Sequence, residues 1–131
     1  MTQTTPSEKD VLAAAAAIVD AFSATDGERY FSLFAPEATF VFHTEPARLD
    51  DRAAYERMWQ EWVASGWRVT SCASSAQRVQ LLPGGAVFTH SVSTSVETPD
   101  GPDSYQERET IVFRSEPNGL IAIHEHLSPQ P

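Results

Sequence analysis

Cysteine is nearly absent from this chain, since Cys72 is the only cysteine among its 131 residues. One thiol excludes an intrachain disulfide and a metal cluster built from cysteine ligands. Nothing beside Cys72 in the sequence would lower its pKa, so we interpret it as a small core or strand residue rather than a nucleophile. The fold must therefore be held by an ordinary apolar core, which a hydrophobic content of 41% can supply.

Long apolar runs and clusters of basic residues are also missing. A membrane-spanning helix needs about 18 consecutive apolar residues, whereas the run over 11–19 is short and consists mostly of alanine. This run follows Glu8, Lys9 and Asp10 rather than a basic stretch, which is unlike a secretory signal, and we expect a cytoplasmic protein. The formal net charge of −9, without a basic run, argues against DNA, RNA and anionic membranes as partners.

Three segments carry helical patterns. Residues 1–6 are polar and end in proline, so we expect a disordered N-terminus followed by a single domain over 7–131. Ser7 and the acidic residues after it resemble a capping box, and the apolar residues that follow repeat at helical spacing. Similar capping signals before apolar stripes predict two more helices. The expected helices lie near 7–24, 26–34 and 50–65.

The remaining sequence is typical of strands. β-Branched and aromatic residues over 38–44 predict a first strand. Turn residues, among them an Asn-Gly pair at 118–119, divide the C-terminal half into a four-strand meander. The expected meander strands cover 67–82, 86–96, 105–114 and 120–128. This order indicates an α+β fold, in which three N-terminal helices pack on one face of a curved antiparallel sheet.

Strand alternation places ionisable residues on the apolar face of this sheet. His90 shares a strand face with Phe88 and Val92, so it should point towards the helices. In the last strand, the more apolar face carries Ile121, Ile123, Glu125 and Leu127. We therefore expect a carboxylate, from Glu125 or Glu109, within hydrogen-bond reach of His90. The pair of His90 and Glu125 can act as general acid and base, or the two side chains can simply hydrogen-bond to each other within a core. One β-bulge would reverse the assignment of the strand faces.

Two further groups of side chains have both a functional and a structural interpretation. His124 and His126 stand two residues apart on one strand face, as in some two-histidine metal sites. No third ligand is obvious, so we expect no metal and no cofactor. Tyr55, Trp59 and Trp62 repeat at helical spacing; such rings can stack on a ligand or simply form the core.

Several sequence segments resemble those of known proteins in their order and spacing. They are the segments 26–39, 49–59, 109–114, 118–119 and 123–128. Together they resemble the nuclear transport factor 2 (NTF2)-like superfamily over about 7–128, in particular its SnoaL-like and ketosteroid isomerase-like families. The last string is most similar to the association domain of calcium/calmodulin-dependent protein kinase II, which ends in a similar His-x-His-x-Ser motif that binds no metal.

The resemblance implies a fold and an assembly. The fold is a cystatin-like cone, in which the helices and the curved sheet enclose a pocket for a small molecule. The assembly is a homodimer packed through the outer face of the sheet, where alternation puts Val87, Thr89 and Ala122.

The resemblance also excludes steroid isomerase activity. That chemistry needs a carboxylate base and two oxyanion donors, and the matching positions carry Phe42, Ile18 and Ile111, which are all apolar. In the kinase association domains, arginines and a tryptophan line the pocket, and the tryptophan is kept here as Trp59. The arginine positions fall on His90, Ile111 and Leu127.

Two functions of different classes remain. The first is a cofactor-independent isomerase, lyase, cyclase or hydrolase that acts on a small apolar metabolite, with His90 and Glu125 as catalytic residues. The second is a non-catalytic module that binds a ligand or forms a dimer. For either function, the predicted ligand-binding residues are Phe42, Tyr55, Trp59, Ile111 and Leu127.

Overall fold

The computed structural model describes residues 5–131, so residues 1–4 of the expected disordered segment lie outside the described residues. Helix α1 (Glu8–Ser23) begins after Ser7, whose hydroxyl accepts a hydrogen bond from the Asp10 amide at 3.1 Å. This N-cap satisfies a backbone donor that the first turn leaves free. The apolar stripe of α1 is buried against the sheet, as its spacing predicts. None of the helices within residues 5–131 is long and apolar enough to span a membrane.

Two shorter helices follow, and each begins at an aspartate. Asp26 caps α2 (Gly27–Ser32), and Asp51 caps α3 (Arg52–Ala64) by accepting a hydrogen bond from the Ala54 amide at 2.8 Å. These carboxylates satisfy backbone N–H groups and favour the positive end of each helix dipole. The three predicted helices are therefore confirmed, with ends that differ by one or two residues.

Five strands form a single sheet. They are β1 (Phe34–Phe42), β2 (Arg68–Leu82), β3 (Gly85–Thr98), β4 (Gly101–Glu116) and β5 (Gly119–Pro129). Their order in the sheet is β1-β5-β4-β3-β2, and the meander pairs are antiparallel as predicted. The pairing of β1 with β5 is parallel, because β1 enters the sheet beside the last strand rather than beside its neighbour in sequence.

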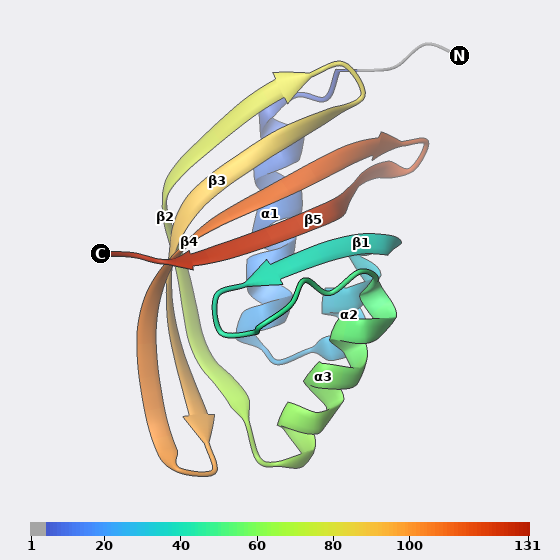
Figure 1. The fold of residues 1–131 in the computed structure, drawn as a ribbon. Coiled ribbons are helices and arrows are strands. Elements are labelled where there is room, and N and C mark those ends of the chain that lie inside the picture. Colours follow the sequence, from blue (N-terminus) through green and yellow to red (C-terminus); the bar gives the residue numbers. More distant parts are fainter. Residues whose placement is uncertain (1–4) are drawn as a thin grey trace.

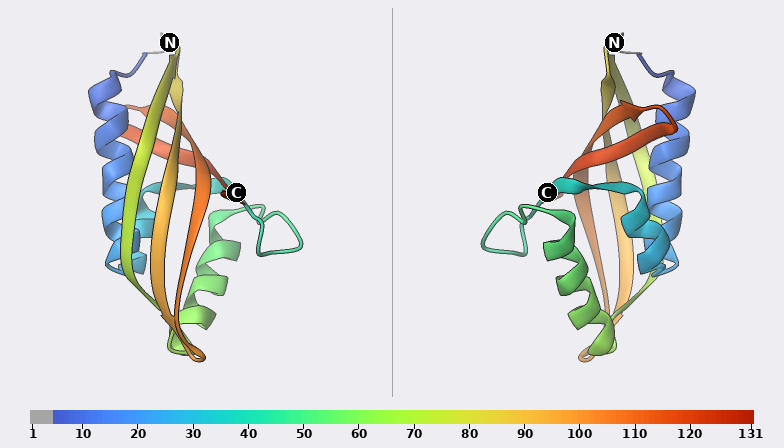
Figure 2. Two further views of the ribbon diagram at one scale, coloured as in Figure 1. Left: turned by 90° about the vertical axis from the view of Figure 1, so that its left-hand side faces the viewer. Right: turned by 90° about the vertical axis from the view of Figure 1, so that its right-hand side faces the viewer.

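The sheet bends strongly, and all three helices lie on its concave side (Figures 1 and 2). In the part of the chain that the structure describes, no helix covers the convex outer face of β2, β3 and β4, which faces the viewer in the left panel of Figure 2. The core fills the space between the layers and is rich in aromatic rings. The expected α+β cone is confirmed.

A β-bulge in β5 changes which residues of that strand face the core. Val112 pairs with His124 and Phe113 pairs with Ala122, which leaves Ile123 as the extra residue. As a result Ala122 is fully buried in the core, although alternation alone assigns it to the outer face. Before the bulge the even-numbered Ala122 faces the core, and after it the odd-numbered residues do. Glu125 is therefore buried, as expected.

Candidate functional site

A cavity of about 440 Å³ lies between the helices and the concave face of the sheet. Its volume falls within the range of about 300–1,000 Å³ that is usual for small-molecule sites. The wall is mostly apolar, and its apolar and aromatic members are Ile18, Val19, Phe22, Tyr30, Phe42, Tyr55, Trp62, Trp67, Val92, Tyr105 and Leu127. The remaining wall carries a small set of polar and ionisable groups.

Two glutamates from neighbouring strands form the polar part of the deep wall. Glu109 of β4 and Glu125 of β5 are 8% and 2% exposed, respectively. Glu109 pairs with Leu127 and Ile111 pairs with Glu125, so the two carboxyls occupy diagonal positions on one face. The Tyr30 hydroxyl donates to the Glu125 carboxyl at 3.1 and 3.3 Å, and lies 3.2 Å from the Tyr55 hydroxyl.

Burial and proximity make this pair hold a proton at neutral pH. Burial raises the pKa of Glu109 to about 7. Burial, and then the neighbouring Glu109 carboxyl, raise the pKa of Glu125 well above its ordinary value. Two carboxyls that interact so closely cannot both ionise, because the second negative charge is opposed by the first. Glu125 therefore keeps its proton while Glu109 titrates near neutrality, and the pair can both accept and deliver a proton.

His90 lies directly behind Glu109 and not in the cavity wall. Its Nε2 is 2.6 Å from Glu109 Oε1, and its Nδ1 is 2.5 Å from the Ser74 hydroxyl, with none of the side chain exposed. Burial lowers the pKa of His90 to about 4, so the ring is neutral at pH 7. Ser74 accepts a hydrogen bond from the Gln77 amide at 3.0 Å, which leaves its own proton to donate to Nδ1. This arrangement places the imidazole proton on Nε2, where it donates to Glu109.

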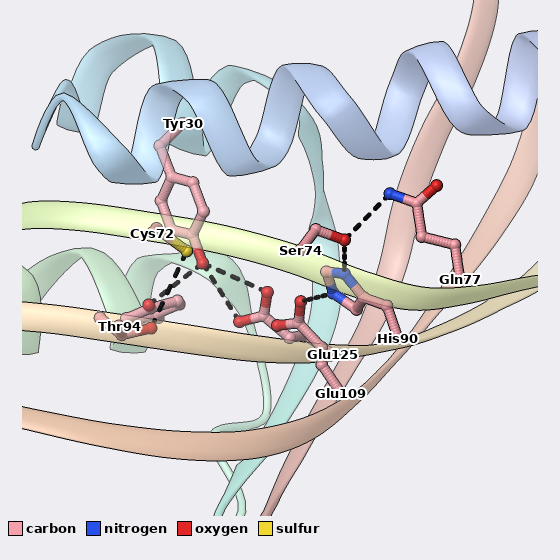
Figure 3. A network of polar contacts seen from close by, with 9 residues as sticks. Tyr30, Cys72, Ser74, Gln77, His90, Thr94, Glu109 and Glu125 are labelled. Carbon is pink, nitrogen blue, oxygen red and sulfur yellow. Dashed lines mark hydrogen bonds and ion pairs between the residues drawn. The ribbon is translucent and has the colours of Figure 1, made fainter.

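The contact between Ser74 and Gln77 depends on a second bulge, in β2. The register shifts between Ser75 and Arg78, and Ala76 adopts a left-handed backbone with φ of 51°. The bulge lets Gln77 reach back to Ser74, so a row of polar groups runs from the surface of β2 through His90 to the two carboxyls (Figure 3). Within residues 5–131, every buried side-chain nitrogen or oxygen has a hydrogen-bond partner.

The predicted ligand-binding residues divide into two groups. Phe42, Tyr55 and Leu127 line the cavity. Trp59 and Ile111 are buried but lie in the core behind the wall. Trp59 stacks on the Tyr30 ring, with 5.1 Å between centroids, and packs so closely on α2 that a methyl group at Gly27 would lie 2.7 Å from its Nε1.

The mouth of the cavity is acidic. Asp103 and Tyr105 are exposed there, and Glu107 forms an ion pair with His43 at 2.6 Å. Cys72 also lines the cavity, and burial raises the pKa of its thiol to about 11, so it is not a nucleophile at neutral pH.

The two C-terminal histidines do not form a metal centre in the part of the chain that the structure describes. No group of three or more histidine, cysteine or acidic side chains is placed to hold a metal ion there. His124 Nδ1 is instead 2.8 Å from the Thr39 hydroxyl, and the His126 side chain is exposed on the outer face.

Together, the fold and the cavity define a class of protein: a small α+β cone that encloses an aromatic pocket with buried acidic groups. The SnoaL-like domain model matches residues 11–131, and the chain belongs to this family, within the NTF2-like superfamily. No relative was found among the curated proteins.

Solved structures share the fold at low sequence identity. An NTF2-like superfamily protein from Salmonella enterica matches with a TM-score of 0.82 and 14% identity, over 94% of this chain and 90% of that one. A protein from Xanthomonas campestris described as a calcium/calmodulin-dependent protein kinase II association domain matches with a TM-score of 0.79 and 16% identity, over 100% and 96%. A Nostoc punctiforme protein of unknown function with a cystatin-like fold gives a TM-score of 0.72 at 14% identity, over 100% and 96%.

Several residues of the site are not identifiable from the sequence pattern as members of it. Tyr30 reads only as an apolar residue of a short helix, and nothing in its surroundings indicates that its hydroxyl meets Glu125. Ser74 belongs to a row of small polar residues that a strand normally exposes. For Glu109 the signal is present, since a glutamate alternates there with Ile111 and Phe113, but its partnership with Glu125 requires the register of β4 and β5.

Proposed function

We propose that this protein binds a small, mostly apolar molecule in the cavity and transfers a proton to or from it without a cofactor. In this role Glu109 is the base that accepts the proton. Glu125, which holds a proton beside the Tyr30 hydroxyl, is the acid that returns one. The reaction class is then an isomerisation, elimination or cyclisation that begins with proton removal, or a hydrolysis in which Glu109 activates water.

The observation that carries this proposal is the pair of carboxyls in an otherwise apolar wall. Burying two acids beside each other is unfavourable, and strongly shifted pKa values of this kind cluster at sites where protons are transferred. A base with a pKa of about 7 has the value that suits proton transfer at neutral pH. His90 then acts as a positioning residue, because it touches Glu109 rather than the cavity.

The first experiment identifies the ligand. Native mass spectrometry of freshly purified protein should detect a small molecule that is retained at one copy per chain. Phe42→Asp, which places a charge in the apolar wall, should abolish retention, whereas the exposed Val63→Asp should not. If neither a retained molecule nor binding from a metabolite extract is found, the cavity is not a ligand site.

The second experiment tests proton transfer on the identified ligand. In D₂O, wild-type protein should catalyse exchange of a ligand C–H for deuterium, or conversion to a product, as followed by NMR. Glu109→Gln should abolish the exchange while ligand binding is kept, and Glu61→Gln on the exposed face of α3 should have no effect. A ligand that binds and is recovered undeuterated and unchanged contradicts catalysis and leaves a binding module.

The second candidate function, a non-catalytic module that binds a ligand or forms a dimer, is supported by a different observation. The outer face of the sheet carries apolar residues that do not pack on the core, namely Val87, Val112 and Ile121. We propose that this face joins two copies of the chain in a homodimer. A dimer is compatible with catalysis and with a purely structural role, so the deuterium experiment distinguishes the two.

A further inference from the structure

The ionisable groups that face the cavity are almost all acidic. Its wall and mouth include four acidic residues, which are Asp103, Glu107, Glu109 and Glu125. None of the described lining residues is a lysine or an arginine. The described lining residues include one imidazole, that of His43, which contacts Glu107. The whole chain adds to this field, since its formal net charge is −9.

This set of groups selects against anions. A carboxylate or phosphate in the cavity would lose its hydration without gaining a cationic partner, and it would lie near the acidic pair. A molecule without charge would fit the apolar wall but would leave the Glu109 carboxylate uncompensated above neutral pH.

The aromatic part of the wall favours positive charge. Rings of Phe22, Tyr30, Tyr55, Trp62 and Trp67 line the same cavity. The face of an aromatic ring attracts a cation within about 6 Å, by roughly 0.5–2 kcal/mol depending on desolvation. Aromatic rings combined with a carboxylate are therefore the complement of an organic ammonium group.

We propose that the molecule bound in the cavity is an apolar amine, whose ammonium group meets the Glu109 carboxylate. The hydrocarbon part of the ligand lies against Phe42, Trp62 and Leu127, which are the apolar surfaces of the same wall. The acidic mouth attracts such a cation from solution before it enters. This inference rests on the proposed function, because it names the substrate class for the same site.

The test compares three probes of similar size and different charge. Naphthylethylamine, naphthylethanol and naphthylacetate are titrated into the protein at about pH 8 by calorimetry, where Glu109 is ionised and the amine is still largely protonated. We expect the amine to bind at least about tenfold tighter than the alcohol, equivalent to ~1.4 kcal/mol, and the carboxylate to bind weakest. Glu109→Gln should reduce the ratio of amine to alcohol affinity to about one and leave alcohol binding intact.

A control separates this contact from general attraction by an acidic protein. Glu61→Gln removes one negative charge from an exposed position on α3 and should preserve the preference for the amine. If the alcohol or the carboxylate binds as tightly as the amine, the inference is overturned while the cavity remains a ligand site. If the amine preference survives in Glu109→Gln, the ammonium group does not meet Glu109 and the inference is equally overturned. If none of the probes binds, both the inference and the proposed ligand site are contradicted.

Discussion

At the scale of single residues, the unusual feature is the pair of buried acids and its neutral histidine. Glu109 and Glu125 are held in a protonated or half-protonated state by burial, and His90 is held neutral by burial. Tyr30 and Tyr55, whose pKa values burial raises, stay neutral as well. These shifts have opposite consequences for stability, because a raised acid pKa favours the folded state at low pH and a lowered histidine pKa favours it at high pH.

The first prediction concerns stability between about pH 6.5 and about pH 8. The folded protein keeps carboxyl protons there that the unfolded chain has released, since the pKa of Glu109 rises from 4.5 to about 7 and that of Glu125 rises further. His90 opposes this fall at the lower end of the window, where the unfolded imidazole, with its ordinary pKa of 6.5, is still partly protonated and the folded ring, with a pKa of about 4, is neutral. Its contribution is constant towards pH 8, where the imidazole is neutral in both states. The free energy of unfolding should therefore fall as pH rises, by up to about 1.4 kcal/mol per pH unit for each proton.

Urea unfolding of wild type, Glu125→Gln and Glu61→Gln across this range provides the measurement. Glutamine mimics the protonated acid, so Glu125→Gln should flatten the dependence, whereas Glu61→Gln should retain it. A wild-type stability that is constant or rises across this range would show that the carboxyls are already ionised in the folded protein.

The second prediction concerns His90 as a positioning residue. His90→Ala removes the donor to Glu109 and leaves a buried carboxyl with one partner fewer, so we expect a stability loss of about 1–3 kcal/mol. Loss of this donor should also raise the pKa of Glu109, and the pH midpoint of ligand binding should move upwards with it. His90→Gln, which keeps an N–H donor, should restore part of the shift. A variant that is less stable but binds with an unchanged pH profile would assign His90 a purely structural role.

At the scale of elements, two β-bulges determine which side chains of β2 and β5 face the core and the cavity. The bulge in β5 buries Ala122 and then lets Glu125 and Leu127 face the cavity. The bulge in β2 brings Gln77 within hydrogen-bond distance of Ser74. Because Ser74 accepts from Gln77 and donates to His90, this contact sets the tautomer of His90. Each bulge inserts one residue into a strand and so changes the face on which every later residue lies.

The third prediction tests the bulge in β2. Ala76 has φ of 51°, a conformation that costs a side-chain-bearing residue roughly 1–2 kcal/mol. Ala76→Gly should therefore stabilise the protein by up to about 1 kcal/mol, and Ala76→Val should destabilise it by about 1–2 kcal/mol, because β-branching worsens the clash. Thermal unfolding of both variants gives the comparison. Equal stability of all three proteins would mean that the backbone is not left-handed at this position.

At the scale of the whole molecule, the cone has one covered face and one open face. Helices and core fill the concave side, while the convex side presents Val87, Val112 and Ile121. No helix within residues 5–131 covers the convex face of β2, β3 and β4 (Figure 2). Beside these residues is a hollow of about 450 Å³, lined by Ala76, Thr89, His90, Ser91, Arg108, Glu109, Thr110, His126 and Ser128. Val87, Val112 and Ile121 are partly exposed, and a contiguous apolar patch on a protein surface is typical of an interaction site.

The fourth prediction is that two copies of the chain associate through this face. Sedimentation equilibrium should give the mass of a dimer, and Val112→Asp should give a monomer that still folds, because the new charge lies outside the core. Val63→Asp adds the same charge to an exposed position of α3 and should leave the dimer intact. A wild-type mass that stays monomeric at all concentrations contradicts the proposed interface.

The amino-acid sequence by itself determined the elements and the class of fold. Capping aspartates and serine, helical apolar stripes and turn residues act within a few positions of one another, so the helices and the order of the meander strands follow from local chemistry. The strand limits follow less closely, since the first strand is Phe34–Phe42 rather than 38–44 and β4 begins at Gly101 rather than at 105. Alternation in β3 and β4 was equally reliable, because these strands pair without a bulge between them, and it placed His90 and Glu109 on the inner face.

Only the tertiary structure decided which of these residues meet. Of the two carboxylates expected near His90, Glu109 is the one that contacts it and Glu125 is not, because β4 lies beside β3 in the sheet and β5 lies one strand further away. Trp59 lies in the core rather than in the cavity wall because its ring stacks on Tyr30 of α2, and Ile111 of β4 is likewise buried outside the wall. The bulges and the parallel docking of β1 depend on contacts between residues far apart in the chain, and such contacts leave no periodic signal in the sequence.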